Sequence, residues 1–363
     1  MNASSRHSGL LLALSIATGA TALFASAGCE KEKPAAVAED AGAGDNRPNK
    51  AQLSGKFGAA VAAAASGQAP SAAAASAANG PPESGIFAPG AADVTQPPAA
   101  PPKVELINDG AEPRFQLAYA PSGDEQRIVI QVSARLGQGG GLPNIDFALS
   151  MKTDKAGLTT ATVVSATPGK EIAAQLPKDF AAAVGKLKGT EIRFTLGPDG
   201  VMSAPAFTLS KDADAGLEIA VRGLIEAMTL MEAPLPKKPV GAGGYWMVTD
   251  RSSTFGIEVV RYRVFKVQKV EKDHGTFAVD VRQYAVKGTN DLGGQQATFE
   301  HFESSGKGNT EWAPSAFFTP GSELNQRMRG QINTGKAGQM AMLQTELTGA
   351  TAPATDDKGT KKK

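Results

Sequence analysis

Thr276–Phe277–Ala278–Val279–Asp280–Val281–Arg282 is the stretch of this 363-residue chain that decides the fold. Its large apolar side chains stand at every second position and alternate with a small residue and with charged ones. Because successive side chains of a β-strand point to opposite faces, this spacing gives a strand one apolar and one polar face. Such strands are typical of an antiparallel sheet that is buried on one side.

Stretches rich in apolar and β-branched residues recur in two runs, on either side of residues 214–231. We expect the first run at 114–119, 127–132, 145–152, 158–167, 191–196 and 201–209, and the second at 245–254, 258–270, 276–286, 297–302, 323–332 and 339–347. Consecutive strands without intervening helices are typical of a meander and not of βαβ units. With helices at 178–187 and 214–231, the sequence predicts an α+β fold: antiparallel β-sheet strands in two runs, with one long and one short helix.

The long helix is expected from Asp214 to Met231, with Asp212 or Asp214 as its cap and Pro234 just past its end. Its apolar residues recur three to four positions apart and form one stripe: Leu217, Val221, Leu224, Ile225, Met228 and Met231. The charged residues Glu218, Arg222 and Glu226 are expected to face away from it. The stripe is predicted to pack on the sheet; alternatively, Met228 and Met231 line an adaptable ligand groove.

A junction rich in proline and glycine follows, with the sequence Pro234–Leu235–Pro236 and then Pro239–Val240–Gly241–Ala242–Gly243–Gly244–Tyr245–Trp246. It resembles the helix-to-sheet junction of an uncharacterised group of secreted bacterial proteins that share a Pro-Leu-Pro/Pro-Val-Gly-x-Gly-x-x-Trp pattern. That resemblance implies no activity. An aromatic side chain at such a junction can cover the end of a core. The alternative is that Trp246 contacts a ligand or a membrane interface.

The N-terminus has the composition of a secretory signal peptide. Arg6 precedes an apolar run from Leu10 to Phe24, which is shorter than the ~20 residues of a membrane-spanning helix. Small residues follow and end at Cys29, the only cysteine of the chain. This pattern resembles the lipobox of bacterial lipoproteins. The resemblance implies that Cys29 is lipidated, becomes the mature N-terminus and anchors the chain in a lipid bilayer.

Two alternatives to lipidation are a plain signal peptide, cut after Ala25–Ser26–Ala27, and an uncleaved N-terminal anchor. Ser26 stands three residues before Cys29, where lipoboxes most often have Leu. The residue after Cys29 is Glu30 and not Asp. By resemblance to enterobacterial sorting rules, Glu30 does not signal retention in the inner membrane. We therefore expect a cell-envelope lipoprotein, with the outer membrane favoured.

The composition divides the chain into four parts. The ranges are 1–28 for the signal peptide, 29–102 for an Ala-, Pro- and Gly-rich tether, 103–350 for one folded α+β domain and 351–363 for a basic tail. The tether has too few large apolar residues to offset its ordering entropy, so it is expected to be disordered. The tail, which ends in three lysines, is expected to be solvated in the same way.

The sequence argues against several classes of function. Its 37 basic and 36 acidic residues do not give the basic surface of a nucleic-acid-binding protein. The mature part keeps His274 and His301 as its only histidines, and the two carboxylates beside His301 point to the opposite face of a strand. No nucleophile elbow, phosphate loop or zinc motif occurs. We therefore expect no metal, no cofactor and no enzymatic activity.

The order of strands, helix and strands resembles the half-barrel lipid-carrier domains of the bacterial envelope. That resemblance implies a domain that binds an apolar or lipid-like ligand between its sheet and its long helix, with Met228, Met231 and Trp246 as candidate lining residues. The alternative is a structural or interaction lipoprotein that presents its sheet surface to an envelope protein. A pocket in the sheet–helix interface would favour the first hypothesis, and a packed interface the second.

Overall fold

A computed structural model describes residues 85–354, except 122, 137–139, 255, 287–288, 292–295 and 334–339. The predicted signal peptide, Cys29, most of the predicted tether and the chain from residue 355 on lie outside the described residues. Among the described residues, no helix combines the length and the hydropathy that crossing a membrane would require.

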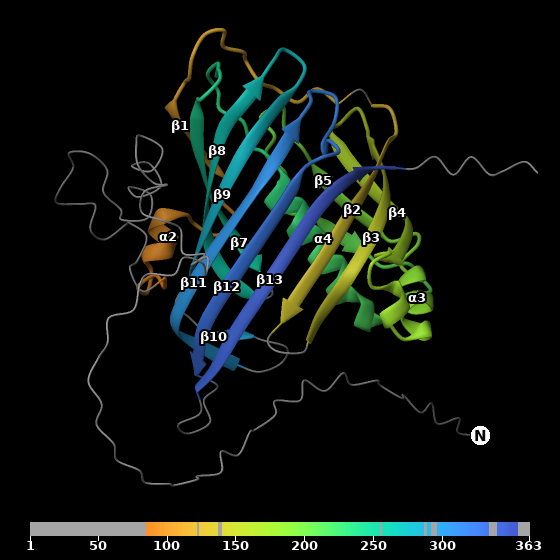
Figure 1. The fold of residues 1–363 in the computed structure, drawn as a ribbon. Helices are drawn as coiled ribbons and strands as arrows, with labels where there is room; N and C mark the ends of the chain where they lie inside the picture. The colour runs from red at the N-terminus through yellow and green to blue at the C-terminus, as the bar shows by residue number, and fades with distance from the viewer. Residues whose placement is uncertain are drawn as a thin grey trace, which may run out of the picture. The chain divides into compact units, whose positions relative to one another are not determined.

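The described residues are mostly antiparallel β-sheet, as Figure 1 shows. The strand order is β1-β7-β8-β9-β11-β12-β13-β2-β3-β4-β5-β6, with β10 paired to β11 alone. The strands are β1 (Lys103–Asn108), β2 (Gln126–Leu136), β3 (Gly140–Thr153), β4 (Leu158–Pro168), β5 (Glu191–Thr195), β6 (Ala206–Thr208), β7 (Tyr245–Thr254), β8 (Ile257–Val270), β9 (Gly275–Ala285), β10 (Thr289–Asp291), β11 (Gln296–Trp312), β12 (Glu323–Asn333) and β13 (Met340–Pro353).

The two predicted runs of strands form one sheet. The last strand, β13, pairs with β2, so that Thr351 lies opposite Ile130 and Thr345 opposite Leu136. This pairing joins the end of the second run to the start of the first. The sheet is open and not closed on itself, because β1 and β6 stand at the two ends of the strand order. The predicted antiparallel, β-rich fold is thus confirmed.

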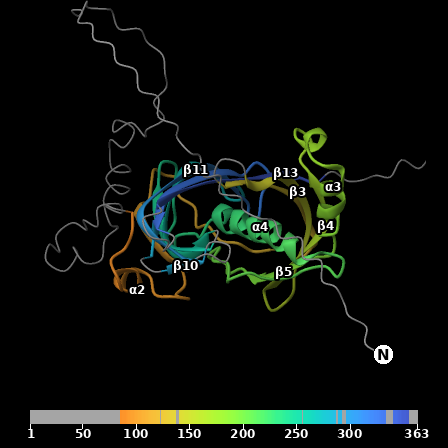
Figure 2. The same cartoon turned by 90° about the horizontal axis from the view of Figure 1, so that it is seen from below.

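The helices are few. They are α2 (Ala91–Thr95), α3 (Lys178–Gly185) and α4 (Glu218–Met231), with short 3₁₀ turns η2 (Ala173–Gln175) and η3 (Ala215–Leu217). The sheet curls around α4, which lies against β2, β3, β12 and β13, as Figure 2 shows from below. We call the face of the sheet toward α4 the concave face and the other the convex face. The long helix is therefore where its apolar stripe predicted it, on the sheet.

Glycine brings α4 close to the sheet. A Cβ atom on Gly349 of β13 would lie 3.1 Å from the Cβ of Ala227 on α4. A Cβ atom on Gly223 of α4 would lie 3.1 Å from Leu142 of β3. Both distances are tighter than ordinary contacts between packed carbon atoms. Larger side chains at these two glycines would push the helix away from the sheet.

The N-terminal arm, which we define as residues 85–102, is packed on the domain although it falls within the predicted tether. Its backbone pairs with the end of β9, where the N–H of Phe87 donates to the carbonyl of Ala285 at 2.9 Å. Phe87 is buried on the convex face with Tyr262 of β8. Arg251 of β7 donates to a side-chain oxygen of Asp93 and thereby ties α2 to the sheet. The burial of Phe87 and the ion pair between Arg251 and Asp93 thus hold this segment on the domain, although its composition predicts disorder.

Other boundaries also differ from the prediction. Residues 114–119 do not form a strand; Phe115 makes a single bridge to Val240. β11 is far longer than the predicted 297–302. The prediction was too short because the paired residues of β11 include small and polar ones, such as Gly306 and Gly308, which hide the alternation in the sequence. β13 continues to Pro353, three residues past the predicted end of the domain.

We expect Phe87→Ala to lower the free energy of unfolding by about 3–5 kcal/mol, because it empties a fully buried aromatic site. The measurement is urea unfolding of the purified chain. Val94→Ala is the matched control on the same arm: Val94 is 65% exposed, and its truncation should cost less than about 0.5 kcal/mol. Equal, small effects of both changes would show that the arm does not contribute to stability.

Candidate functional site

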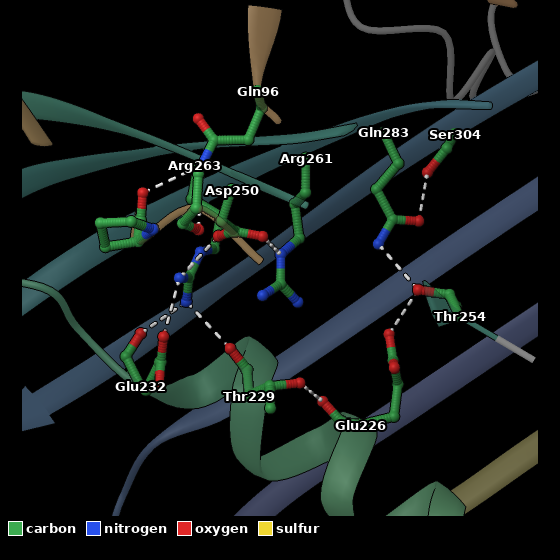
Figure 3. A network of polar contacts seen from close by, with 12 residues as sticks. Gln96, Glu226, Thr229, Glu232, Asp250, Thr254, Arg261, Arg263, Gln283 and Ser304 are labelled. Atoms are coloured by element: carbon green, nitrogen blue, oxygen red, sulfur yellow. Dashed lines mark hydrogen bonds and ion pairs between the residues drawn. The ribbon is translucent and has the colours of Figure 1, made fainter. Parts of the chain in front are cut away.

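Five charged side chains are buried together where the end of α4 meets the concave face. Arg261 and Arg263 come from β8, Asp250 from β7, Glu226 from α4, and Glu232 follows the last residue of α4 (Figure 3). Each is at most 7% exposed. We call these five residues the charged cluster. Because burying an ion costs several kcal/mol, a cluster of this size inside a domain indicates a specific role.

Strand register assembles the cluster. Asp250 stands directly opposite Arg261 in the antiparallel pair of β7 and β8, and Arg263 lies two residues further along β8 on the same face. The residues of β8 on either side of the arginines on that face are apolar and buried, namely Val259 and Phe265. The two guanidinium groups therefore interrupt an apolar face, at the level where α4 ends.

Arg263 caps the C-terminus of α4. Its Nη1 donates to the carbonyl oxygens of Thr229 and Glu232, both at 2.9 Å. Its Nη2 donates to Glu232 Oε1 at 3.0 Å and to Asp250 Oδ2 at 2.9 Å. The last carbonyls of a helix lack partners within the helix and carry partial negative charge. A guanidinium in this position satisfies them and the two carboxylates at once.

Among the described residues, the guanidinium of Arg261 makes one hydrogen bond, from its Nε to Asp250 Oδ1 at 2.8 Å. Its Nη1 is buried and has no hydrogen-bond partner among the described residues. Figure 3 shows this guanidinium pointing toward α4, in the space between Glu232 and Glu226. The charge of Arg261 therefore acts on both glutamates without a direct hydrogen bond to either.

A chain of hydrogen bonds leads from the neighbouring strands to Glu226. Thr254 Oγ1 donates to Glu226 Oε1 at 2.6 Å, and Gln283 Nε2 donates to Thr254 Oγ1 at 3.4 Å. Ser304 Oγ donates to Gln283 Oε1, and Gln326 Nε2 donates to Ser304 Oγ. Each of these donors points along the row toward Glu226, which accepts the last hydrogen bond. Figure 3 shows the part of this row from Ser304 to Glu226.

These polar residues form a row across the concave face between two apolar clusters. On β9, Gln283 lies between Val281 of the main core and Ala285 of a smaller cluster. On β12, Gln326 divides Leu324 from Met328 in the same way. The concave face is therefore not uniformly apolar. The polar row marks the part of this face that the C-terminal end of α4 covers.

Burial shifts the protonation of both glutamates. Desolvation raises the pKa of Glu232 to about 7, although Arg263 and Arg261 oppose the shift. Desolvation also raises the pKa of Glu226, against the charge of Arg261 and the hydrogen bond from Thr254. The phenol of Tyr119, which the charge of Glu232 reaches, has its pKa raised by burial as well. The cluster can thus exchange a proton near neutral pH.

The residues proposed from sequence as ligand-lining are buried in protein contacts. Met228 and Met231 belong to the face of α4 that packs on the sheet. Trp246 donates its indole N–H to the carbonyl of Pro234 at 2.7 Å and stacks on Phe265 at 5.4 Å between ring centroids. Trp246 is therefore packed within the main core of the domain. Trp246 and Met228 are wholly buried and Met231 is 2% exposed, so none of the three lines an opening.

Sequence reasoning missed the charged cluster. The helical wheel placed Glu226 on the outward face of α4 with Glu218 and Arg222, but it is buried against Thr254, so that assignment is wrong. The signal that could have found the cluster is the pair Arg261 and Arg263, two positions apart within the apolar strand β8.

The two histidines of the described chain lie apart. His274 contacts Glu311 at 3.1 Å, and His301 contacts Glu303 at 3.0 Å; His274 is half-buried and His301 is exposed. Within residues 85–354, apart from the gaps stated above, no group of three or more His, Cys, Asp or Glu side chains could hold a metal ion.

Comparison with protein-family models, curated proteins and solved structures found no match for this chain. α4 and the strands cover the charged cluster. Its side chains therefore stabilise the folded structure, and a movement of α4 would be needed to expose them.

We expect Arg263→Ala to lower the free energy of unfolding by about 3–5 kcal/mol, because Glu232 and the end of α4 lose their charged donor and Asp250 loses one of its two. Arg222→Ala is the matched control: Arg222 pairs with Glu218 on the exposed side of α4, where such pairs contribute about 0.3–0.5 kcal/mol. Urea unfolding measures both. Similar losses for the two variants would contradict the capping role.

Proposed function

We propose that this chain is a bacterial envelope lipoprotein, anchored through Cys29, whose folded part is a non-catalytic interaction domain. The signal-like N-terminus and the lone cysteine support the anchor. The residues between Cys29 and the folded domain would act as a tether that holds the domain away from the membrane. Its partner would be another protein of the envelope.

The observation that supports an interaction role is the filled concave face. Leu224 and Met228 of α4 are wholly buried, and the helix lies in direct contact with Gly349 of β13. A carrier of small apolar ligands normally has a largely preformed pocket. With the concave face occupied by its own helix, the domain has its convex face and its strand edges left for recognition.

The convex face offers a broad polar surface. Arg135, Glu346 and Arg327 lie side by side across β2, β13 and β12. Arg327 contacts Glu346 at 3.2 Å, and Asn325 donates to the same carboxylate at 2.8 Å. Such a surface, with both signs of charge, resembles the polar rim of protein interfaces more than an apolar ligand site.

The second candidate is a domain that binds an apolar or lipid-like ligand, in the manner of half-barrel lipid carriers. The feature that favours it is a curled sheet with one long helix across its concave face. In this case α4 would have to leave the sheet to admit the ligand. The two candidates therefore differ in whether α4 moves.

A disulfide between α4 and β13 separates the candidates. Ala227→Cys with Gly349→Cys would place the two Cβ atoms about 3.1 Å apart, somewhat closer than the ~3.5–4.5 Å of natural disulfides, so α4 and β13 would have to separate slightly for the bond to form. The variant carries Cys29→Ser, so that the only thiols are the designed pair. The probe is a fluorescent fatty acid, measured with the oxidised and the reduced protein, beside capture of envelope proteins.

We expect capture of the same envelope protein by the oxidised and reduced forms, and no uptake of the fatty acid by either. Uptake by the reduced form alone would overturn the interaction role in favour of the lipid-binding candidate. The single variants Ala227→Cys and Gly349→Cys are the controls, since they change the same sites without a crosslink.

Cys29→Ser should release the protein from the membrane fraction. Each buried CH₂ of an acyl chain contributes ~0.8 kcal/mol, and more than one chain is needed for stable anchoring. The measurement is fractionation of cells after a high-salt wash, which removes proteins bound by charge alone. If the Ser variant still sediments with membranes after that wash, the lipid anchor is excluded.

A further inference from the structure

The charged cluster contains one more carboxylate than it has cations. Glu226, Glu232 and Asp250 face two guanidinium groups, Arg261 and Arg263, all within a sealed interior. Guanidinium stays protonated at any pH at which a protein folds. With all three carboxylates ionised, the cluster would therefore bury one uncompensated negative charge, which is strongly unfavourable. One added proton makes it neutral.

We infer that the charged cluster is a buried proton-binding site and that Glu232 holds this proton in the folded domain below neutral pH. The assignment follows from which oxygen atoms have donors. Asp250 receives a donor on each oxygen, from Arg261 Nε and from Arg263 Nη2. Glu226 Oε1 receives the hydroxyl of Thr254. Glu232 Oε1 receives Arg263 Nη2, but Glu232 Oε2 is buried and is, among the described residues, the buried carboxylate oxygen of the cluster that has no donor.

The groups that face Glu232 come from every element around it. Arg263 and Arg261 lie on β8 and favour its charged form, while Asp250 on β7 disfavours it. Tyr119, from the segment between β1 and β2, also senses its charge. Tyr119 stays neutral near pH 7, because its own pKa is raised. Desolvation outweighs the two arginines, so the neutral form of Glu232 prevails below its pKa of about 7.

Stability then depends on pH in a definite direction. In the unfolded chain, a glutamate has a pKa of about 4.3. Between that value and the folded pKa of about 7, the folded state binds a proton that the unfolded state releases. The site is thus destabilising above neutral pH and relieved in acid. A single linked proton changes the folding constant by up to about tenfold per pH unit.

The test is urea unfolding of the full chain carrying Cys29→Ser, over about pH 5 to about pH 8.5, which covers the range below about pH 7 where this linkage acts and the range above it where it does not. We expect the folding constant to fall, by up to about tenfold per pH unit, as the pH rises toward 7. Glu232→Gln keeps the shape and the acceptor of a neutral carboxyl, so this variant should lose that slope. Glu218→Gln, on the exposed side of α4, is the matched control and should keep it.

Infrared spectroscopy of the folded protein reads the proton directly and needs no stability measurement. We expect a protonated-carboxyl band at pH 6 that Glu232→Gln abolishes and Glu218→Gln leaves in place. Loss of the band in Glu226→Gln and its persistence in Glu232→Gln would overturn the assignment to Glu232. Absence of the band in the parent chain, or the same pH slope with and without Glu232→Gln, would overturn the proton site itself.

Discussion

The fold depends on the guanidinium of Arg263. It reaches from β8 to two terminal carbonyls of α4, to Glu232 and to Asp250, so one side chain joins a helix end to two strands. Hydrogen bonds of this charged kind are about twice as strong as neutral ones. They act here away from water, where each would be costly to lose. The end of α4 is therefore fixed by direction and charge as well as by apolar contact.

The remainder of the sheet is arranged to accept that helix. Gly349 and Gly223 let α4 and the strands approach closely, and the apolar stripe of α4 fills the face between them. The pairing of β13 with β2 joins strands that are about 200 residues apart in the chain. Because this contact closes a very long loop, its entropic cost must be met by the burial that the completed sheet provides.

The sequence predicted elements whose patterns are local. The alternation in β9 and the apolar stripe of α4 each lie within a single segment, and the structure has the strand and the helix there. It could not predict what depends on distant partners. The Ala- and Pro-rich N-terminal arm is held on the domain because Phe87 packs in one buried cluster with Tyr262 of β8. The sequence placed Glu226 toward solvent because its partner, Thr254, lies 28 residues away on another strand. No local pattern gives the register of that strand.

The charged cluster explains why α4 has one position on this sheet. An apolar stripe repeats every three to four residues, so a helix shifted by one turn, about 5.4 Å, would still bury apolar side chains. The same shift would take the carbonyl of Glu232 away from Arg263 and leave buried ions unpaired, at a cost of several kcal/mol. Apolar contact therefore supplies the attraction, and the charges select the register. The proton on Glu232 lets three carboxylates serve this purpose beside two arginines.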